Sequence, residues 1–341
     1  MKKKFLLGAI ALASAIVLAS CDSAATITDA SGSTINVTKT NDSAEVAKAL
    51  DALENVKTDT SNITCASIKE NVYFNIDTEN GDLYTKVKLD ENGDLYSWIT
   101  SESESLVNFY LNSNIKLDYH VKEKSSLGLV QTNELNFDAK VNAFNKDNNV
   151  YASWSGLNLG DEFPNEAKAY LSYPTIKNII DNILENANVS SSEIDLDAII
   201  AKLKKEYSTK EICEKLGITI SSTSSNEIEF SINCSIKDLY DMLSKVDSQM
   251  SSQLEGMVET IGSARLVLYV RVNVTNNLPV KVEAKLEGIK EAMQNALASN
   301  DDKTKVNAAD FNFKLEFAYD ATIPTLPDTK DYVPFNDLFK K

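Results

Sequence analysis

The sequence predicts an α+β fold built on one large, curved antiparallel sheet, a half-barrel, with helices covering its concave face. About eleven segments alternate apolar and polar residues with a period of two, so each strand would have one apolar side. The helical segments fall in two blocks that lie between groups of strands. Strands of about eleven residues extend roughly 36 Å, or about three helix diameters. Several helices must therefore cover the apolar side, or a hollow stays open.

The first twenty residues have the layout of an export signal. Three lysines, Lys2 to Lys4, precede fourteen mostly apolar residues from Phe5 to Leu18, fewer than the ~20 that span a bilayer. The run ends in Leu18-Ala19-Ser20-Cys21, which resembles the lipobox of bacterial lipoproteins. That resemblance implies cleavage of residues 1–20 and lipidation of Cys21 as the new N-terminus. We expect two or three acyl chains to hold the protein at the extracytoplasmic face of the cell membrane.

Residues 21–42 are small and polar and have neither helical nor strand periodicity, which predicts a flexible tether after the lipidated cysteine. We expect residues 43–341 to form a single half-barrel-like domain, with a helical insertion at 173–216. Asp42 or Ser43 can cap a first helix that runs to about Val56, with an apolar stripe that includes Val46, Leu50 and Leu53.

Strand patterns then dominate as far as about residue 155. The sequence Glu79-Asn80-Gly81-Asp82-Leu83-Tyr84 recurs as Glu91-Asn92-Gly93-Asp94-Leu95-Tyr96. Asn-Gly between alternating runs is a strong hairpin signal, because turn positions with positive φ favour these residues. Two consecutive tight hairpins are therefore predicted here.

The remaining elements follow from the same periodicities. Further strands are predicted at 115–121, 135–144, 150–155, 218–222, 227–234, 266–274, 280–286 and 311–319, and helices over 236–261 and 289–297. Within 173–216, two apolar stripes, at 176–184 and 196–203, predict two helices, and a short third helix is predicted at 209–216.

Composition and motifs exclude several classes of function. The formal charge of −16 includes the three signal lysines, so the mature chain would carry about −19, which excludes nucleic-acid binding. No Cys-x-x-Cys, Walker or Gly-x-Ser-x-Gly motif is present. His120, the single histidine, falls on a charged strand face and is interpreted as a surface residue. No catalytic residue, metal or cofactor is predicted.

Three cysteines remain beyond Cys21 in the expected mature chain, so at least one thiol is free. If a disulfide forms, Cys213 and Cys234 are the favoured pair, because each lies on the apolar side of its own element. Free, buried cysteines are the preferred interpretation, and Cys65 would then also be free.

The order of elements is similar to that of the half-barrel lipoproteins of the LolA/LolB and LppX/LprG type. The similarity consists of the lipobox, a short helix at 44–56, a strand meander, a helical insertion, the hairpin at Leu278 to Glu283 and an aromatic strand ending in Ile323-Pro324. Members of those families curl an antiparallel sheet around helices and bind acyl chains or lipidated molecules in the hollow. This chain departs from them in its longer helical insertion.

The leading expectation is therefore a non-enzymatic membrane lipoprotein that binds a hydrophobic or lipid-like ligand. Methionine side chains adapt to irregular apolar contents, although core packing is the plainer interpretation of Met242, Met250 and Met257. The predicted ligand wall consists of Met242, Val246, Met250, Met257, Leu266, Leu268, Val270, Phe313 and Phe317. An alternative is a surface interaction or structural lipoprotein with a solid core, whose protein partner the sequence does not identify. A carboxylate-based hydrolase comes third.

Overall fold

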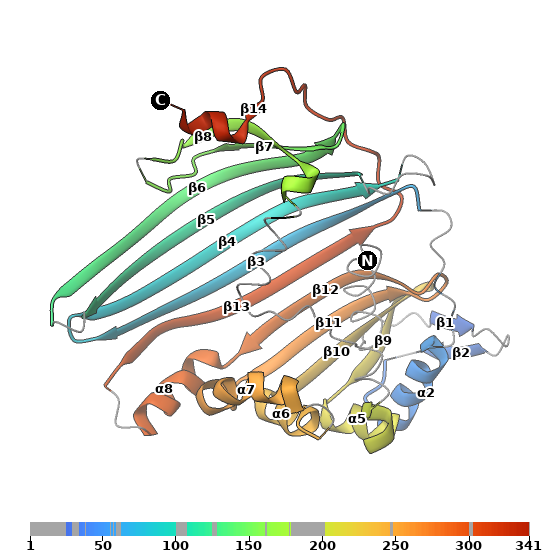
Figure 1. Ribbon diagram of the computed structural model, residues 1–341. Coiled ribbons are helices and arrows are strands. Elements are labelled where there is room, and N and C mark those ends of the chain that lie inside the picture. The colour runs from blue at the N-terminus through green and yellow to red at the C-terminus, as the bar shows by residue number, and fades with distance from the viewer. Residues whose placement is uncertain are drawn as a thin grey trace. The chain divides into compact units, whose positions relative to one another are not determined.

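The computed structural model describes residues 25–28, 34–37, 39–54, 56, 58, 63–99, 108–124, 128–160, 162–176, 178, 202–245, 248–299 and 303–340, except the side chains of Glu54 and residues 248–254. Strands outnumber helices, which confirms the α+β class. Figure 1 shows the helices and strands with their labels. The chain divides into two compact units. Unit 1 comprises Met1–Asn62 and Asp195–Glu316, and unit 2 comprises Ile63–Ile194 and Phe317–Lys341.

Unit 1 contains an antiparallel sheet in the order β10-β11-β12-β13. The strands of this unit are β1 Ala25–Thr28, β2 Thr34–Val37, β9 Thr219–Ser224, β10 Glu227–Ser235, β11 Arg265–Asn273, β12 Leu278–Glu287 and β13 Lys305–Ala318, whose last two residues belong to unit 2. The hairpin predicted from the alternation at 266–286 is confirmed as β11 and β12, whose register shifts between Arg271 and Val272.

Five helices of unit 1 are described: α2 Ser43–Glu54, α5 Thr209–Lys215, α6 Ile236–Leu243, α7 Ser248–Ile261 and α8 Ile289–Ser299. The single helix predicted for 236–261 is wrong, because α6 ends before a turn at Ser244 and Lys245. The Ser244 hydroxyl donates to the Asp241 carbonyl oxygen at 3.2 Å. Such serine-to-backbone bonds compete with continued helix, and the amphipathic pattern of the segment did not reveal this stop.

The main core of unit 1 is sealed between helices and strands. Side chains of α2 and α5 pack with those of β9, β10 and β11, and Phe230 and Ile228 at its centre are both fully buried. The predicted stripe of α2 is confirmed by Val46 and Leu53, which are buried in this core. A second, smaller cluster lies between α6, α7, α8 and β13.

The N-terminal segment differs from the predicted tether. β1 and β2 pair antiparallel, with Ala25 opposite Val37 and Ile27 opposite Ile35. Ala25, Ile27 and Val37 are buried in the main core of unit 1. The tether prediction is therefore wrong for residues 25–28 and 34–37. Two four-residue strands separated by a Ser-Gly-Ser stretch are too short to produce a recognisable period of two.

Unit 2 is built from long antiparallel strands in the order β3-β4-β5-β6-β7-β8, with β14 parallel to β8 at the edge. They are β3 Cys65–Asn80, β4 Leu83–Trp98, β5 Asn108–Lys124, β6 Val130–Lys146, β7 Asn149–Ser155, β8 Glu166–Ser172 and β14 Val333–Pro334, followed by the 3-10 helix η1 Phe335–Phe339. At one end, Phe144, Tyr151 and Tyr332 form a small aromatic core.

Of the two predicted Asn-Gly hairpins, one is confirmed. The β3–β4 turn has Gly81 and Asp82 at its centre, and Gly81 has a φ of +60°, which suits the first position of a two-residue hairpin turn. The hairpin at Asn92-Gly93 is wrong, because β4 runs through both residues. A side chain at Gly93 would lie 2.9 Å from the Asn112 carbonyl oxygen, so glycine is needed here for close packing.

The predicted helical insertion is described only at its ends. Residues 173–176 form one helical turn, residues 202–206 are helical, and α5 confirms the short helix predicted near 209–216. The apolar stripes predicted between 179 and 200 lie outside the described residues, as do residues 1–20 and Cys21. In the part of the chain that is described, no helix is long and apolar enough to cross a membrane.

Candidate functional site

The predicted ligand wall is not assembled as one surface. Val246 and the Met250 side chain lie outside the described residues, and Met257 on α7 is 42% exposed. Phe313 on β13 is half-buried opposite Ala284, and Phe317 stacks on Tyr319 at a ring-centroid distance of 6.5 Å. The other four residues of the predicted wall, Met242, Leu266, Leu268 and Val270, all pack in or against the main core of unit 1.

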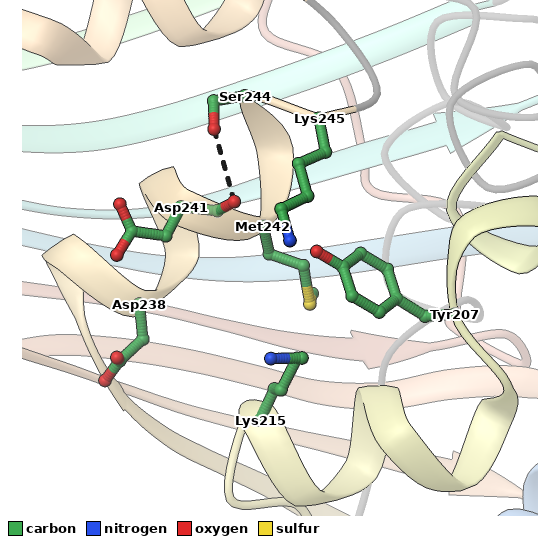
Figure 2. Close-up of a pocket in the computed structure, with 7 residues that line it drawn as sticks. All are labelled: Tyr207, Lys215, Asp238, Asp241, Met242, Ser244 and Lys245. Atoms are coloured by element: carbon green, nitrogen blue, oxygen red, sulfur yellow. Dashed lines mark hydrogen bonds between the residues drawn. The ribbon is translucent and has the colours of Figure 1, made fainter.

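Met242 lines a cavity of about 520 Å³ in unit 1 (Figure 2). Its other lining residues are Tyr207, Lys215, Asp238, Asp241, Ser244 and Lys245, so the wall is mostly polar. Met242 is itself buried and also belongs to the main core. The predicted apolar wall therefore includes one residue of this cavity, Met242, but the sequence did not predict that the rest of the lining is polar.

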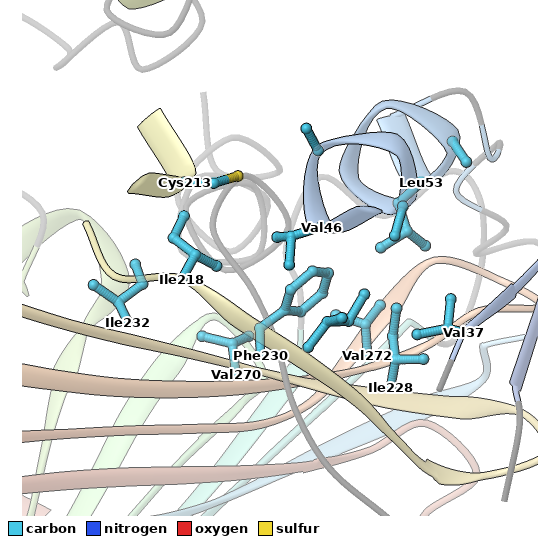
Figure 3. Close-up of a cluster of buried hydrophobic side chains, with 14 of the residues drawn as sticks. Val37, Val46, Leu53, Cys213, Ile218, Ile228, Phe230, Ile232, Val270 and Val272 are labelled. Atoms are coloured by element: carbon cyan, nitrogen blue, oxygen red, sulfur yellow. The ribbon is translucent and has the colours of Figure 1, made fainter. Parts of the chain in front are cut away.

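The other three residues pack into the main core of unit 1. Val270 is only 1% exposed, and Leu266 and Leu268 are partly buried against the same cluster. Figure 3 shows Val270 and Phe230 among aliphatic side chains from α2 and the strands. These residues are core constituents in unit 1, in agreement with the plainer interpretation of the pattern.

An extended apolar surface is found in unit 2. The strand registers place twelve apolar residues on one side of β3, β4, β5 and β6, in three cross-strand rows. These rows, defined here as the apolar face, are Phe74-Leu89-Leu117-Phe137, Ile76-Val87-Tyr119-Leu135 and Ile68-Leu95-Leu111-Ala143. Every one of the twelve is half-buried, and none belongs to a buried cluster formed by the described residues.

The opposite side of the same strands is charged. Ion pairs join neighbouring strands there: Lys86 with Asp118, and Lys116 with Asp138 at 2.9 Å. The His120 imidazole also lies 3.2 Å from the Glu134 carboxylate. The hydrogen bond to Asp118 raises the pKa of Lys86. This arrangement confirms the sequence interpretation of His120 as a surface residue of a charged face. The sheet is therefore strongly two-sided, as alternation with a period of two requires.

A polar inset interrupts the apolar face between its rows. Glu70 faces Gly93 and Ser113 in one cross-strand row, and Glu91 lies in the next row on the same side. Ser113 is 1% exposed, and its hydroxyl donates to a Glu91 carboxylate oxygen at 2.9 Å. Burial first, and then the charges of Glu91 and Asp94, raise the pKa of Glu70. The inset is thus an acidic, hydrogen-bonding feature within an otherwise apolar surface.

The cysteines and arginines have structural roles. Cys65, Cys213 and Cys234 are all free and buried, which confirms the preferred interpretation over a Cys213–Cys234 bridge. Burial raises the pKa of both Cys213 and Cys234 to about 11, so these thiols stay protonated and are poor nucleophiles. Arg271 pairs with Glu229 at 2.7 Å, and Arg265 donates to the Asn233 carbonyl oxygen.

The search for metal-binding groups and the comparisons with known proteins identify no activity. Among the described residues, no group of three or more His, Cys, Asp or Glu side chains could hold a metal ion. A scan against protein-family models finds no matching family, and searches of curated proteins and of solved structures find no match either. The candidate functional surfaces are therefore the apolar face of unit 2 and the polar cavity of unit 1.

Proposed function

We propose that this chain is a bacterial lipoprotein, anchored through Cys21 to the extracytoplasmic face of the cell membrane, that binds a hydrophobic or lipid-like molecule without catalysing a reaction. The observation that carries the proposal is the apolar face of unit 2, whose twelve apolar side chains are half-buried. An extended apolar surface of this kind is characteristic of ligand or partner binding.

The ligand would lie along the cross-strand rows, and burial of apolar area would supply the binding free energy at roughly 25 cal/mol per Å². In this proposal the strands of unit 2 are the wall of a half-barrel, as in the LolA/LolB and LppX/LprG lipoproteins that the sequence resembles. The wall predicted from residues of β11 is replaced by one from β3 to β6, because Val270 belongs to a filled core.

Lipid binding can be tested with the chain from residue 21 onward, carrying Cys21→Ser so that it remains in solution. After solvent delipidation, the protein is titrated with cis-parinaric acid, whose fluorescence rises in an apolar site. We expect saturable binding that Leu117→Gln weakens about tenfold, because a central apolar contact is lost. Lys116→Gln, on the charged side of the same strand, is the matched control and should bind normally.

Two results would contradict the proposal: no saturable binding by the parent protein, or equal affinity in the Leu117 and Lys116 variants. Circular dichroism melts of both variants verify that each is folded. The anchor is tested separately by Cys21→Ser in the full chain, which should move the protein from the membrane fraction to the soluble fraction.

A second candidate function is a protein-interaction module without a small ligand. The filled core of unit 1 favours it, because Phe230 and Val270 leave no hollow where the sequence first predicted a ligand. Absence of any saturable lipid binding, in a protein that still partitions to the membrane through Cys21, would favour this candidate.

A further inference from the structure

The cavity of unit 1 brings two lysines to one tyrosine. Tyr207 is 8% exposed, and its backbone N–H donates to the Leu203 carbonyl oxygen at 2.8 Å. The Nζ atoms of Lys215 and Lys245 each lie 5.5 Å from the centroid of the Tyr207 ring. Figure 2 shows both lysines beside Tyr207, although Lys215 comes from α5 and Lys245 from the turn that follows α6. We propose that this cavity binds a dianionic group, such as the phosphate monoester of a small molecule.

Among the described residues, the carboxylates near these two lysines have other partners. Asp241 pairs with Lys237 at 2.9 Å, and Glu214 pairs with Lys210 at 3.6 Å. The Asp238 carboxylate accepts a hydrogen bond from the Ser235 hydroxyl at 2.6 Å. In Figure 2 the carboxylates of Asp238 and Asp241 point away from the tyrosine.

Glu211, the remaining acidic side chain of α5, is held at the start of its helix by Ser208, whose hydroxyl donates to it at 2.7 Å. The backbone and hydroxyl hydrogen bonds of Ser208 lower the pKa of Glu211, and the charge of Lys215 adds only a minor part of that shift. Among the described residues, neither Lys215 nor Lys245 forms an ion pair within 4 Å.

Two positive charges that face one aromatic ring repel each other, and the attraction of each to the ring leaves its charge intact. Helix C-termini favour cations, which keeps both lysines in place without neutralising them. An anion with two negative charges between the ammonium groups removes the repulsion and gains a charge-assisted hydrogen bond from each lysine. A cavity of about 520 Å³ also has room for the organic part of a small phosphate ester.

The proposal is tested with inorganic phosphate as the probe and with the Cys21→Ser chain from residue 21. Reductive [¹³C]dimethylation of the lysines keeps their positive charge and gives NMR signals. The signal of Lys215 is identified by its absence from the spectrum of the Lys215→Gln variant. The signal of Lys245 is identified in the same way with Lys245→Gln. We expect both signals to shift saturably as phosphate is added and to give the same dissociation constant. In each variant, the signal of the remaining lysine should report a dissociation constant about tenfold higher.

Lys210→Gln and Lys237→Gln are the matched controls, because these lysines lie on the same two helices but are ion-paired. Both controls should leave the dissociation constant unchanged. The proposal is overturned if phosphate shifts neither signal, if the replacements do not weaken binding, or if the controls weaken it as much. All four lysines are exposed, and Lys215→Arg and Lys245→Arg, which should retain binding, verify that the charge is what matters.

Discussion

The strands of units 1 and 2 have the same alternation of apolar and polar residues, but their apolar sides are buried to different extents. In unit 1, the apolar sides of β10 and β11 are sealed by α2, α5 and the β1–β2 hairpin, which leaves Phe230 fully buried. In unit 2, the apolar side of β3 to β6 carries residues of equal hydrophobicity, such as Phe74 and Leu117, that are only half-buried. Periodicity therefore predicts which side of a strand is apolar, but the surrounding elements determine whether that side becomes core or surface.

The largest expected effect tests this contrast directly. Phe230→Ala should lower the free energy of unfolding by about 3–5 kcal/mol, because it leaves a cavity in a sealed core. Phe74→Ala should cost only about 1–2 kcal/mol, since its side chain is partly exposed and belongs to no sealed core of the described residues. Urea denaturation followed by circular dichroism gives both values. Equal costs would mean that the apolar face is filled in the native protein and would break the comparison.

Glycine positions provide a second contrast. Gly93→Ala in unit 2 should cost about 1–3 kcal/mol, because the new methyl group would meet the Asn112 carbonyl oxygen and the Glu70 side chain. Gly256→Ala in α7 of unit 1 is the control, since nothing lies within 4 Å of the added carbon. It should stabilise the helix by up to about 1 kcal/mol. A neutral Gly93→Ala would indicate that β3, β4 and β5 are less closely packed than described.

Loss of a helix cap in unit 1 should have a moderate effect on stability. The Ser235 hydroxyl accepts a hydrogen bond from the backbone N–H of Asp238 at 3.0 Å and completes a capping box. Ser235→Ala should therefore cost about 1 kcal/mol in thermal or urea unfolding. Ser224→Ala, at the half-buried end of β9 in the same unit, removes a hydroxyl that accepts one hydrogen bond, from the backbone N–H of Asn226 at 3.3 Å. Because Ser224 caps no helix, this control should cost less than half as much.

The smallest effects concern pH and have opposite signs in the two units. The pKa of Glu70 is raised in the folded protein, so the folded state binds this proton more tightly than the unfolded state. Stability from this group then falls as pH rises from the unfolded pKa through the folded pKa. Glu70→Gln should raise the melting temperature at pH 7, and this gain should disappear near pH 4.

Glu211 is the counterpart in unit 1. Hydrogen bonds from Ser208 lower its pKa, so its stabilisation is present above the unfolded pKa and is lost as pH falls through the folded pKa. Glu211→Gln should therefore lower the melting temperature at pH 7 and converge with the parent protein in acid. Melting curves between pH 3 and 8 check both carboxyls, and shifts of the same sign would contradict the assigned environments.

Much of the fold could be predicted because strand phase is a local property. Across the Asn80-Gly81 turn the apolar positions change from even to odd numbers, which indicates chain reversal. Around Gly93 they stay odd, from Leu89 to Leu95, so the strand continues despite the same turn motif. The numbering of the apolar positions predicts both the turn at Asn80-Gly81 and the continuous strand at Asn92-Gly93. The Asn-Gly motif alone predicts the turn correctly but wrongly predicts a second turn at Gly93.

The sites were less predictable, because they depend on contacts between distant residues. Lys215, Lys245 and Tyr207 belong to no sequence motif and meet only because the fold brings α5 close to the turn that follows α6. The apolar face was predicted as a pattern, since its rows are visible in the alternation of β3 to β6. The sequence did not show that this face stays outside the buried clusters while the predicted β11 wall becomes core, because that depends on which elements cover each strand.

The first strand begins only a few residues after Cys21, which limits how far a lipid anchor at Cys21 could lie from the folded protein. Ala25 is already buried in β1, only four positions after Cys21. Four fully extended residues span at most about 14 Å. If Cys21 is acylated, unit 1 would sit directly against the lipid headgroups, with no stalk to carry it across a wide envelope. Its ligands would then have to be met at the bilayer surface itself.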